Sequence, residues 1–253
     1  MANNYINPDQ IKEEFIRIRS LGWLKNTRSQ NNDGAAGNIF EDHLGVDENN
    51  LTQPDYKGWE VKTKKQMSKS WMSLYTKKPS DERFTDNYMR EKFGIPDERY
   101  PDVKCFRTSL YAHRFSIVYQ RHKIKMNVNR NENKLEILFC DLDENIIDKN
   151  VYWTFKDLLS GAKKLKNMFV VSAEVKNENG IHYFKYTNAT ILMNYEGNEK
   201  ILDLLEKGLI RYDNRLGVHG PSTDKAGQPH NHGGGLRIDP KNIHLLYKEV
   251  LEV

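Results

Sequence analysis

Long apolar runs and cysteines are scarce in this chain. No segment of its 253 residues approaches the ~18 apolar residues that a membrane-spanning helix needs. The opening residues, MANNYINPDQ, contain no signal-peptide core. The two cysteines, Cys105 and Cys140, lack the spacing of metal ligands and indicate reduced thiols. We therefore expect a protein of a cytoplasmic setting.

Hydrophobic residues are also few, at 38% of the chain. Against this low share stand 13 Tyr, 10 Phe and 4 Trp, whose large side chains can bury much surface and argue against a disordered chain. The length suits one large domain or two small lobes that share a core. The net charge of +4 is only a weak indication of an anionic partner.

The distribution of charge says more than the total. Residues 61–80, VKTKKQMSKSWMSLYTKKPS, contain six lysines and no carboxylate. Solvated surfaces usually mix both signs, so a stretch of one sign suits a phosphate backbone. A basic surface strand without a partner is the alternative.

The pattern of helices and strands is mixed. Asn7 as N-cap, Pro8 at the first helical position and Gly22 after the end predict a first helix whose buried face carries Ile11, Phe15 and Ile18. Further helices are predicted at about 35–44, with Phe40 and Leu44 buried, and in VYWTFKDLLSGAKKL and GNEKILDLLEKGL. Strands are predicted in WEVKTK, SLYTKK, KLEILFCD, MFVVSAEV and HYFKYTNATILM. This mixture indicates an α/β or α+β fold.

One segment breaks the pattern. Residues 217–235, GVHGPSTDKAGQPHNHGGG, hold six glycines, two prolines and three histidines without apolar periodicity. We interpret this segment as a long functional or disordered loop. No internal repeat or linker-like tract is visible, so residues 1–253 are predicted to form a single domain with two lobes around a cleft.

The stretch PDYKGWEVKTKK brings three charged residues close together. Along a strand, alternate side chains share a face, so Glu60 and Lys62 project together while Val61 faces the core. The turn formers Pro54 and Gly58 can bring Asp55 beside Glu60. Two adjacent carboxylates favour a bound cation, and magnesium prefers such oxygen ligands. A neighbouring lysine can orient or deprotonate a water, so the pattern suits metal-dependent phosphodiester hydrolysis. The alternative is a surface strand edge with solvated charges, which would show the same sequence pattern.

Several motifs, in order, resemble one family. The segments GNIFEDHLG, QPD, WEVKTKK, SLYTKKP, NVYWTFKDL, MFVVSAE and PHNHGGGLRI together look like the MvaI/BcnI group of restriction endonucleases, which are relatives of the nicking enzyme MutH. The likeness covers nearly the whole chain and is closer to the MvaI branch.

The resemblance implies a PD-(D/E)XK nuclease core, a mixed central sheet flanked by helices, and a recognition lobe that forms a DNA cleft. It implies that Asp55 and Glu60 bind Mg²⁺, for which Mn²⁺ can substitute, and that Lys62 handles the attacking water. Glu41 would be a further acidic member of this site, with Asp42 as the alternative. The backbone contacts would come from lysines of the basic stretch, namely Lys69 and either Lys77 or Lys78 on the strand after the site.

The resemblance also implies where bases are read. Residues 1–195 would be mainly catalytic and residues 196–253 mainly the recognition lobe. The matching base-reading positions are Asp213, Arg215, His230, His232 and Arg237. The family pattern has an acidic residue between the two histidines, whereas this chain has Asn231, so the pairing at that base is not carried over. A zinc site at the two histidines is a rival interpretation, but it lacks nearby further ligands.

The function implied is a prokaryotic type II restriction endonuclease. It would cut double-stranded DNA at a short, nearly palindromic CC-x-GG site, leaving a 5′-phosphate and a 3′-hydroxyl. It would act as a monomer without an obligate protein partner, alongside a cognate DNA methyltransferase. One alternative is a MutH-like strand-nicking repair enzyme. Another, from a different class, is a non-catalytic DNA-binding protein.

Overall fold

The computed structural model describes residues 6–28, 34–46 and 54–253, which form two compact units. The first unit comprises residues up to Met72, Lys163–Glu196 and Lys241–Val253. The second comprises Ser73–Ala162 and Gly197–Pro240. Both units are discontinuous in sequence, unlike the continuous lobes 1–195 and 196–253 that we expected.

Strand pairing explains this difference in boundaries. The C-terminal strand Tyr247–Glu252 pairs with Ile181–Tyr195, which ties the chain end to the first unit. The strand Ile210–Val218 pairs with Lys104–Leu110, which joins the two sequence segments of the second unit. These long-range pairings leave no local mark in the sequence.

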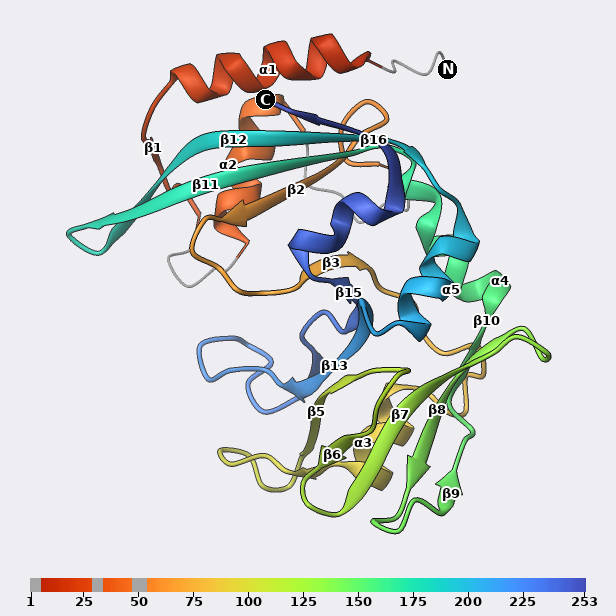
Figure 1. The fold of residues 1–253 in the computed structure, drawn as a ribbon. Helices are drawn as coiled ribbons and strands as arrows, with labels where there is room; N and C mark the ends of the chain where they lie inside the picture. Colours follow the sequence, from red (N-terminus) through yellow and green to blue (C-terminus); the bar gives the residue numbers. More distant parts are fainter. Residues whose placement is uncertain (1–5, 29–33, 47–53) are drawn as a thin grey trace. The chain divides into compact units, whose positions relative to one another are not determined.

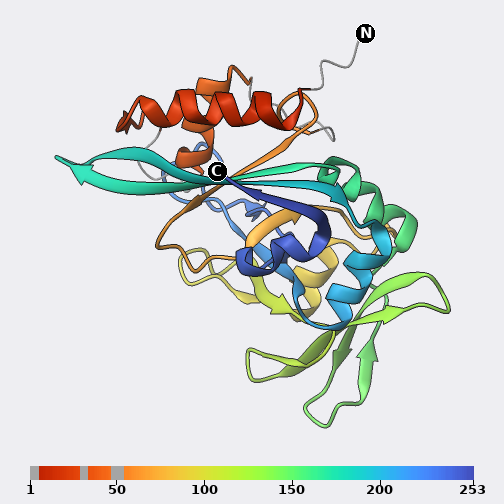
Figure 2. The same cartoon turned by 45° about the horizontal axis from the view of Figure 1, so that its top comes forward.

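The first unit is a mixed sheet with helices. Its elements are α1 (Pro8–Ser20), β1 (Leu24–Lys25), α2 (Ala35–Leu44), β2 (Glu60–Lys65), β11 (Met168–Glu178), β12 (Ile181–Tyr195), the 3-10 helix Pro240–Leu246 and β16 (Tyr247–Glu252). The strand order is β1-β12-β11-β2, with β16 also on β12. The strand β2 runs parallel to β11, and the other pairs are antiparallel, so the predicted mixed α/β fold is confirmed. Figures 1 and 2 show β11 and β12 as a long hairpin and α1 running along the sheet.

The first helix begins and packs as predicted. Asn7 and Gln10 form a capping box, in which each side chain accepts the other residue's backbone N–H at 2.9 Å. Ile11, Phe15 and Ile18 are fully buried. In α2, Phe40 packs edge-on against Tyr186 of β12, with ring centroids 4.8 Å apart. The two helices therefore cover the face of the sheet that carries Val61.

The second unit contains two further sheets. Its elements are β3 (Met72–Tyr75), α3 (Asp86–Phe93), β4 (Ile95–Pro96), β5 (Lys104–Leu110), β6 (Ser116–Val118), β7 (His122–Asn129), β8 (Lys134–Cys140), β9 (Ile146–Asp148), β10 (Tyr152–Thr154), α4 (Phe155–Leu159), the 3-10 helix Ser160–Leu165 at its border, α5 (Asn198–Glu206), β13 (Ile210–Val218), β14 (Pro229–Asn231) and β15 (Gly235–Ile238). One sheet has the order β10-β8-β7-β6 with β9 on β8. The other has the order β3-β15-β13-β5-β4 with β14 on β13.

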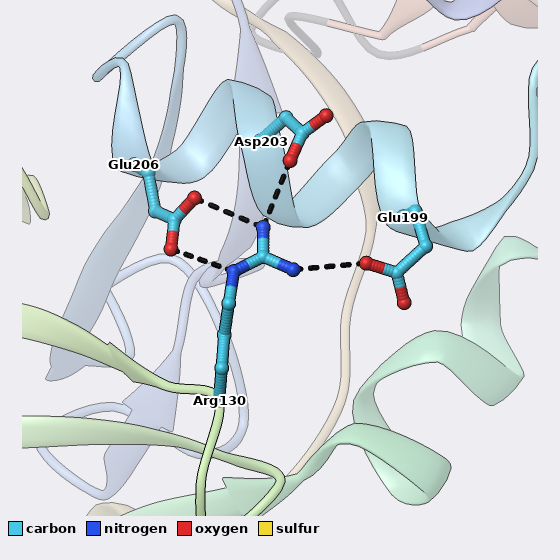
Figure 3. Close-up of polar contacts among 4 residues, drawn as sticks. All are labelled: Arg130, Glu199, Asp203 and Glu206. Carbon is cyan, nitrogen blue, oxygen red and sulfur yellow. Dashed lines mark hydrogen bonds and ion pairs between the residues drawn. The ribbon is translucent and has the colours of Figure 1, made fainter.

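An ion-pair cluster ties the turn between β7 and β8 to α5. The Arg130 guanidinium contacts the carboxylates of Glu199, Asp203 and Glu206 at 2.8–2.9 Å (Figure 3). The acidic residues raise the pKa of Arg130, and the pairing lowers the pKa of Glu206. The helix α5 is followed by β13, so this cluster holds the start of the central strand of the sheet β3-β15-β13-β5-β4.

Three local predictions need correction. The predicted helix over VYWTFKDLLSGAKKL begins only at Phe155, because Tyr152–Thr154 pairs with β8 and the Thr154 side chain caps α4. The predicted strand SLYTKK ends at Tyr75, so Lys77 and Lys78 lie beyond it. The predicted loop 217–235 is partly β structure, because β14 pairs with the end of β13.

Two smaller observations concern the cysteines and the lengths of the helices. Both cysteines are free and buried, and burial raises the pKa of each thiol. In the three described ranges, no helix is long and apolar enough to cross a membrane.

Candidate functional site

A tight turn sets up the first candidate site. Tyr56 and Trp59 exchange two backbone hydrogen bonds of 2.9 and 2.7 Å across Lys57 and Gly58. Both turn residues have positive φ, 41° and 92°, as a type I′ turn requires. Glycine meets this requirement at the second position without steric cost. The turn folds the chain back so that Asp55 lies beside the first residues of β2.

The carboxylates of Asp55 and Glu60 are brought together in this way. Asp55 Oδ2 accepts the backbone N–H of Val61 at 3.1 Å. The Glu60 backbone N–H donates to the Asn167 carbonyl at 3.0 Å, at the start of the parallel pairing between β2 and β11. The negative charge of Asp55 contributes to a raised pKa of Glu60. The structure therefore places these two predicted residues within electrostatic reach of each other.

Glu60 is the most constrained group of this site. Its side chain has no solvent exposure, and Oε1 forms ion pairs with Lys62 Nζ and, at 2.6 Å, with Lys164 Nζ. Oε2 is buried and has no hydrogen-bond partner among the described residues. Burial, followed by the charge of Asp55, raises the pKa of Glu60, while the two lysines oppose that rise. An unsatisfied buried carboxylate oxygen is costly and is compensated by a cation.

These residues fit a hard divalent cation. Asp55 and Glu60 supply carboxylate oxygens, which Mg²⁺ prefers, and Mg²⁺ commonly completes its shell with waters and a substrate phosphate. Within the described ranges, no group of three or more His, Cys, Asp and Glu residues is arranged to hold a metal ion. The protein's contribution is thus a carboxylate pair with one free buried oxygen.

Lys164 was not predicted from the sequence. It lies in the 3-10 helix Ser160–Leu165, four residues before Met168, which pairs with Glu60 at the start of both parallel strands. Residues that precede one strand therefore meet residues that begin the other. The lysine-rich segment KKLK before a strand was the available signal, but the partner strand cannot be deduced from it.

The expected third acidic residue, Glu41, lies on the helix that precedes the carboxylate pair. It lies on α2, where a Cβ on Gly37 would be 3.8 Å from Glu41 Oε1 and 3.9 Å from Thr63 Cβ. Thr63 alternates with Lys62 along β2 and so projects to the opposite face from Glu60. In the described ranges, no group of three or more acidic or other ligating side chains that includes Glu41 is arranged to hold a metal ion, and its role in the site stays a prediction. Its neighbour Asp42 forms an ion pair with Arg28 at 2.6 Å.

The second candidate site is one face of the β13 sheet. Alternation along β13 places Arg211, Asp213, Arg215 and Gly217 on the same face. Arg237 of β15 pairs with Arg211, and His230 of β14 pairs with Gly217. The structure therefore brings together base-reading candidates that lie up to 24 residues apart in the sequence.

Asp213 is fully engaged on this face. Ser109 Oγ donates to its Oδ1 at 2.7 Å, Arg211 Nε lies 2.7 Å from Oδ1, and Arg237 Nε lies 3.3 Å from Oδ2. Burial lowers the pKa of the Arg237 guanidinium, and Asp213 opposes that change. Asp213 therefore holds two arginines in place, and Arg211 was not anticipated from the sequence.

The histidines form an aromatic cluster. The His230 ring stacks on His219 at 4.0 Å and meets His232 edge-on at 4.5 Å. His232 Nε2 is 3.1 Å from the Val218 carbonyl. Burial, then the neighbouring histidines, lowers the pKa of His230. His219 is an additional member that the sequence did not single out.

Asn231, which departs from the family pattern, has a structural role. Its amide nitrogen donates to Asp86 Oδ2 at 2.7 Å, and its amide oxygen accepts the Gly234 N–H at 2.7 Å. An acidic residue at this position would face Asp86 with a like charge. The asparagine therefore suits this local environment.

The three candidate backbone lysines differ in their surroundings. Lys69 and Lys78 are exposed, whereas Lys77 is half-buried. The Lys77 carbonyl accepts the Trp153 indole N–H at 3.0 Å, and its ammonium contributes to the lowered pKa of Asp157. Of Lys77 and Lys78, Lys78 is therefore more accessible to a DNA phosphate.

Comparisons with known proteins show the family and the fold of this chain. A model of the MvaI/BcnI restriction endonuclease family matches residues 12–247. A solved complex of the restriction endonuclease MvaI with cognate DNA is 28% identical at a TM-score of 0.88, over 98% of this chain and 99% of that one. A structure of MvaI without DNA is 27% identical at a TM-score of 0.60, over 100% and 98% of the two chains. No curated protein matched the chain.

The family model spans nearly the whole chain, and the matched fold is that of a restriction endonuclease. The resemblance inferred from the motifs is thereby confirmed. The chain belongs to the MvaI/BcnI restriction endonuclease family and is a site-specific DNA endonuclease.

Proposed function

We propose that this endonuclease hydrolyses double-stranded DNA with Mg²⁺ held by Asp55 and Glu60. The observation that carries the proposal is the buried Glu60 carboxylate, with one oxygen on two lysines and the other without a partner. Such an arrangement is unfavourable alone and becomes favourable once a cation binds. Mn²⁺ should substitute for Mg²⁺, because both accept oxygen ligands.

The chain's own residues have distinct roles in this proposal. Lys62 orients the attacking water and assists its deprotonation, since its ammonium lies at the carboxylate pair. Lys164 favours the ionised form of Glu60 and fixes its Oε1. A bound Mg²⁺ would supply Lewis-acid polarisation of the scissile phosphate. In-line attack at phosphorus leaves a 5′-phosphate and a 3′-hydroxyl. Glu41 remains a candidate that assists from α2.

Recognition is assigned to the face of β13. Arg215, Arg237, His230 and His232 read base edges in the major groove, where arginine meets guanine O6 and N7. Asp213 was expected to accept from a cytosine amino group, and its saturated contacts favour a supporting role instead. Lys69 and Lys78, or Lys77, contact phosphates and carry no sequence information. The CC-x-GG site class follows from the family resemblance.

The biological setting follows the same family. MvaI was solved with cognate DNA, and this chain is proposed to bind a cognate site likewise. We expect a monomer that nicks one strand and then the other, in the cytoplasm, alongside a methyltransferase that protects the host DNA. A MutH-like nicking enzyme would share the chemistry but require a partner. A non-catalytic DNA-binding protein would be expected to lack Asp55, Glu60 or Lys62, all of which are present.

Plasmid digestion tests the proposal. Mg²⁺ and Mn²⁺ should support cleavage at discrete sites, EDTA should abolish it, and Ca²⁺ should permit binding without turnover. Sequencing the ends of the digested plasmid then gives the site, the cut position and the end chemistry. Full cleavage in excess EDTA would exclude the metal mechanism, and nicked circles alone would favour the MutH-like alternative.

A further inference from the structure

Arg107 on β5 lies directly across from Arg215 on β13. The two are register partners in the antiparallel pair, so their side chains leave the same face of the sheet. Both residues are exposed. Like charges directly opposite each other destabilise a sheet unless a counter-charge is supplied. The pair therefore calls for an anionic or strongly hydrogen-bond-accepting partner above this face.

Gly217 shows how far the Arg107 side chain reaches across that face. A Cβ on Gly217 would lie 2.5 Å from Arg107 NH2 and 3.0 Å from both Cδ2 and Nε2 of His232. The guanidinium and the imidazole therefore share the space over this glycine. Arg107 comes from a strand that the sequence reading left out, yet its charged end lies beside a base-reading candidate.

The protein neutralises Arg107 only weakly. In the described ranges, the one carboxylate within ion-pair distance is that of Asp97, with Oδ2 3.7 Å from NH2. The Arg107 side chain stays 55% exposed. Its backbone is anchored, because its N–H donates to the Tyr119 hydroxyl at 2.9 Å. Arg107 thus combines an anchored backbone with a guanidinium group that is largely exposed to solvent.

We propose that Arg107 is a further specificity-determining residue, whose guanidinium reads base edges in the same groove as Arg215 and His232. The proposal rests on the function proposed above, since it requires that the β13 face meet the major groove. The planar guanidinium can bind guanine O6 and N7 as a bidentate donor. Its position over Gly217, beside His232, distinguishes it from a surface arginine that contacts phosphates.

Competition binding in Ca²⁺ tests this assignment. The probes are a duplex with the site mapped by plasmid digestion and a scrambled duplex of equal length. The variants are Arg107→Ala, Arg107→Lys, Arg215→Ala and, as a matched control, Arg121→Ala, an exposed arginine of the β6–β7 turn. Arg107→Ala should weaken cognate binding about 10–100-fold and scrambled binding by less than about threefold. Arg107→Lys should keep scrambled binding but not restore the cognate preference, and Arg121→Ala should change neither.

The outcomes separate this inference from the proposed function. If Arg107→Ala weakens both duplexes equally, the residue contacts phosphate and the inference is wrong. If Arg107→Ala weakens binding to neither duplex while Arg215→Ala loses the preference for the cognate duplex, only the role proposed for Arg107 is wrong. If the wild-type protein shows no preference between the duplexes, the proposed recognition face itself fails.

Gly217→Ala supplies an independent measurement. The new methyl group would displace the flexible end of Arg107 and crowd His232, so cognate binding should fall with the fold retained by circular dichroism. In an Arg107→Ala background the same change should cost clearly less, because the two changes act on one shared space. Additive losses would show that Arg107 does not occupy the space over Gly217 when DNA is bound.

Discussion

Two carboxylates in this enzyme, Glu60 and Asp213, are each held by two basic side chains, yet their environments differ. Glu60 gives one oxygen to Lys62 and Lys164 and keeps Oε2 without a partner in the described chain. Asp213 has contacts on both oxygens, to Ser109, Arg211 and Arg237. The first carboxylate has capacity left for a cation, whereas the second has none.

The basic side chains that hold these two carboxylates also differ. Lysines at Glu60 are compact point charges that stabilise its ionised form and can act on a water. Arginines at Asp213 are planar forks with fixed donors, and Arg211 also donates to the Tyr111 hydroxyl and Arg237 to the Gly233 carbonyl. A carboxylate with an open oxygen suits chemistry, and a saturated one suits orientation. Substitutions at Glu60, Lys164, Asp213 and Arg130 test this contrast.

The largest effect is expected at Glu60. Glu60→Gln removes the charge that would hold the cation, so cleavage should fall by more than about 10³-fold. Cognate binding in Ca²⁺ should stay within about tenfold, because base and phosphate contacts lie on other residues. Single-turnover cleavage and competition binding measure the two quantities. A variant that cuts near the wild-type rate would remove Glu60 from the site.

Lys164 should come next. Lys164→Met keeps the apolar stem but removes the ammonium that fixes Glu60 Oε1, so single-turnover cleavage should fall about 10–100-fold. The loss should be smaller than in Lys62→Met, because Lys62 is the residue proposed to act on the attacking water. Lys164→Arg should recover part of the activity because it restores the charge. Equal activity of Lys164→Met and wild type would show that the ion pair is only structural.

Asp213→Asn tests the saturated carboxylate. Loss of its charge should loosen Arg211 and Arg237, lowering the free energy of unfolding by about 1–3 kcal/mol. The cognate preference should fall by about tenfold. Cleavage at saturating DNA should change far less than in Glu60→Gln. Undiminished preference would mean that the two arginines keep their orientation without Asp213.

The smallest effect is expected at Arg130, which also lies between carboxylates but is 41% exposed. Arg130→Ala should lower the melting temperature by only a few degrees at low salt and by nothing measurable at 1 M salt. The pairing lowers the folded-state pKa of Glu206, so its contribution is present above the unfolded pKa and is lost as pH falls through the folded pKa. Wild type and variant should therefore converge in acid. A difference that persists at pH 2 would contradict the ion-pair origin.

Local sequence patterns were enough to predict the helices, the strands and the carboxylate pair. The capping residues of α1, the apolar spacing of α2 and the β-rich runs predicted elements that the structure confirms. The stretch from Asp55 to Lys62 was readable because a turn and a strand bring nearby residues together. The ordered motifs pointed to the family that the comparisons confirm.

Contacts between residues far apart in the sequence could be read only from the folded chain. Lys164 joins Glu60 only because β2 and β11 start side by side in a parallel pair. Arg107 meets Arg215, and Asp213 meets Arg237, only through the order of strands in the second unit. Helical and strand periodicity encode which face a residue occupies, but the pairing of strands far apart in sequence is set by packing of the whole unit, and no local pattern records it.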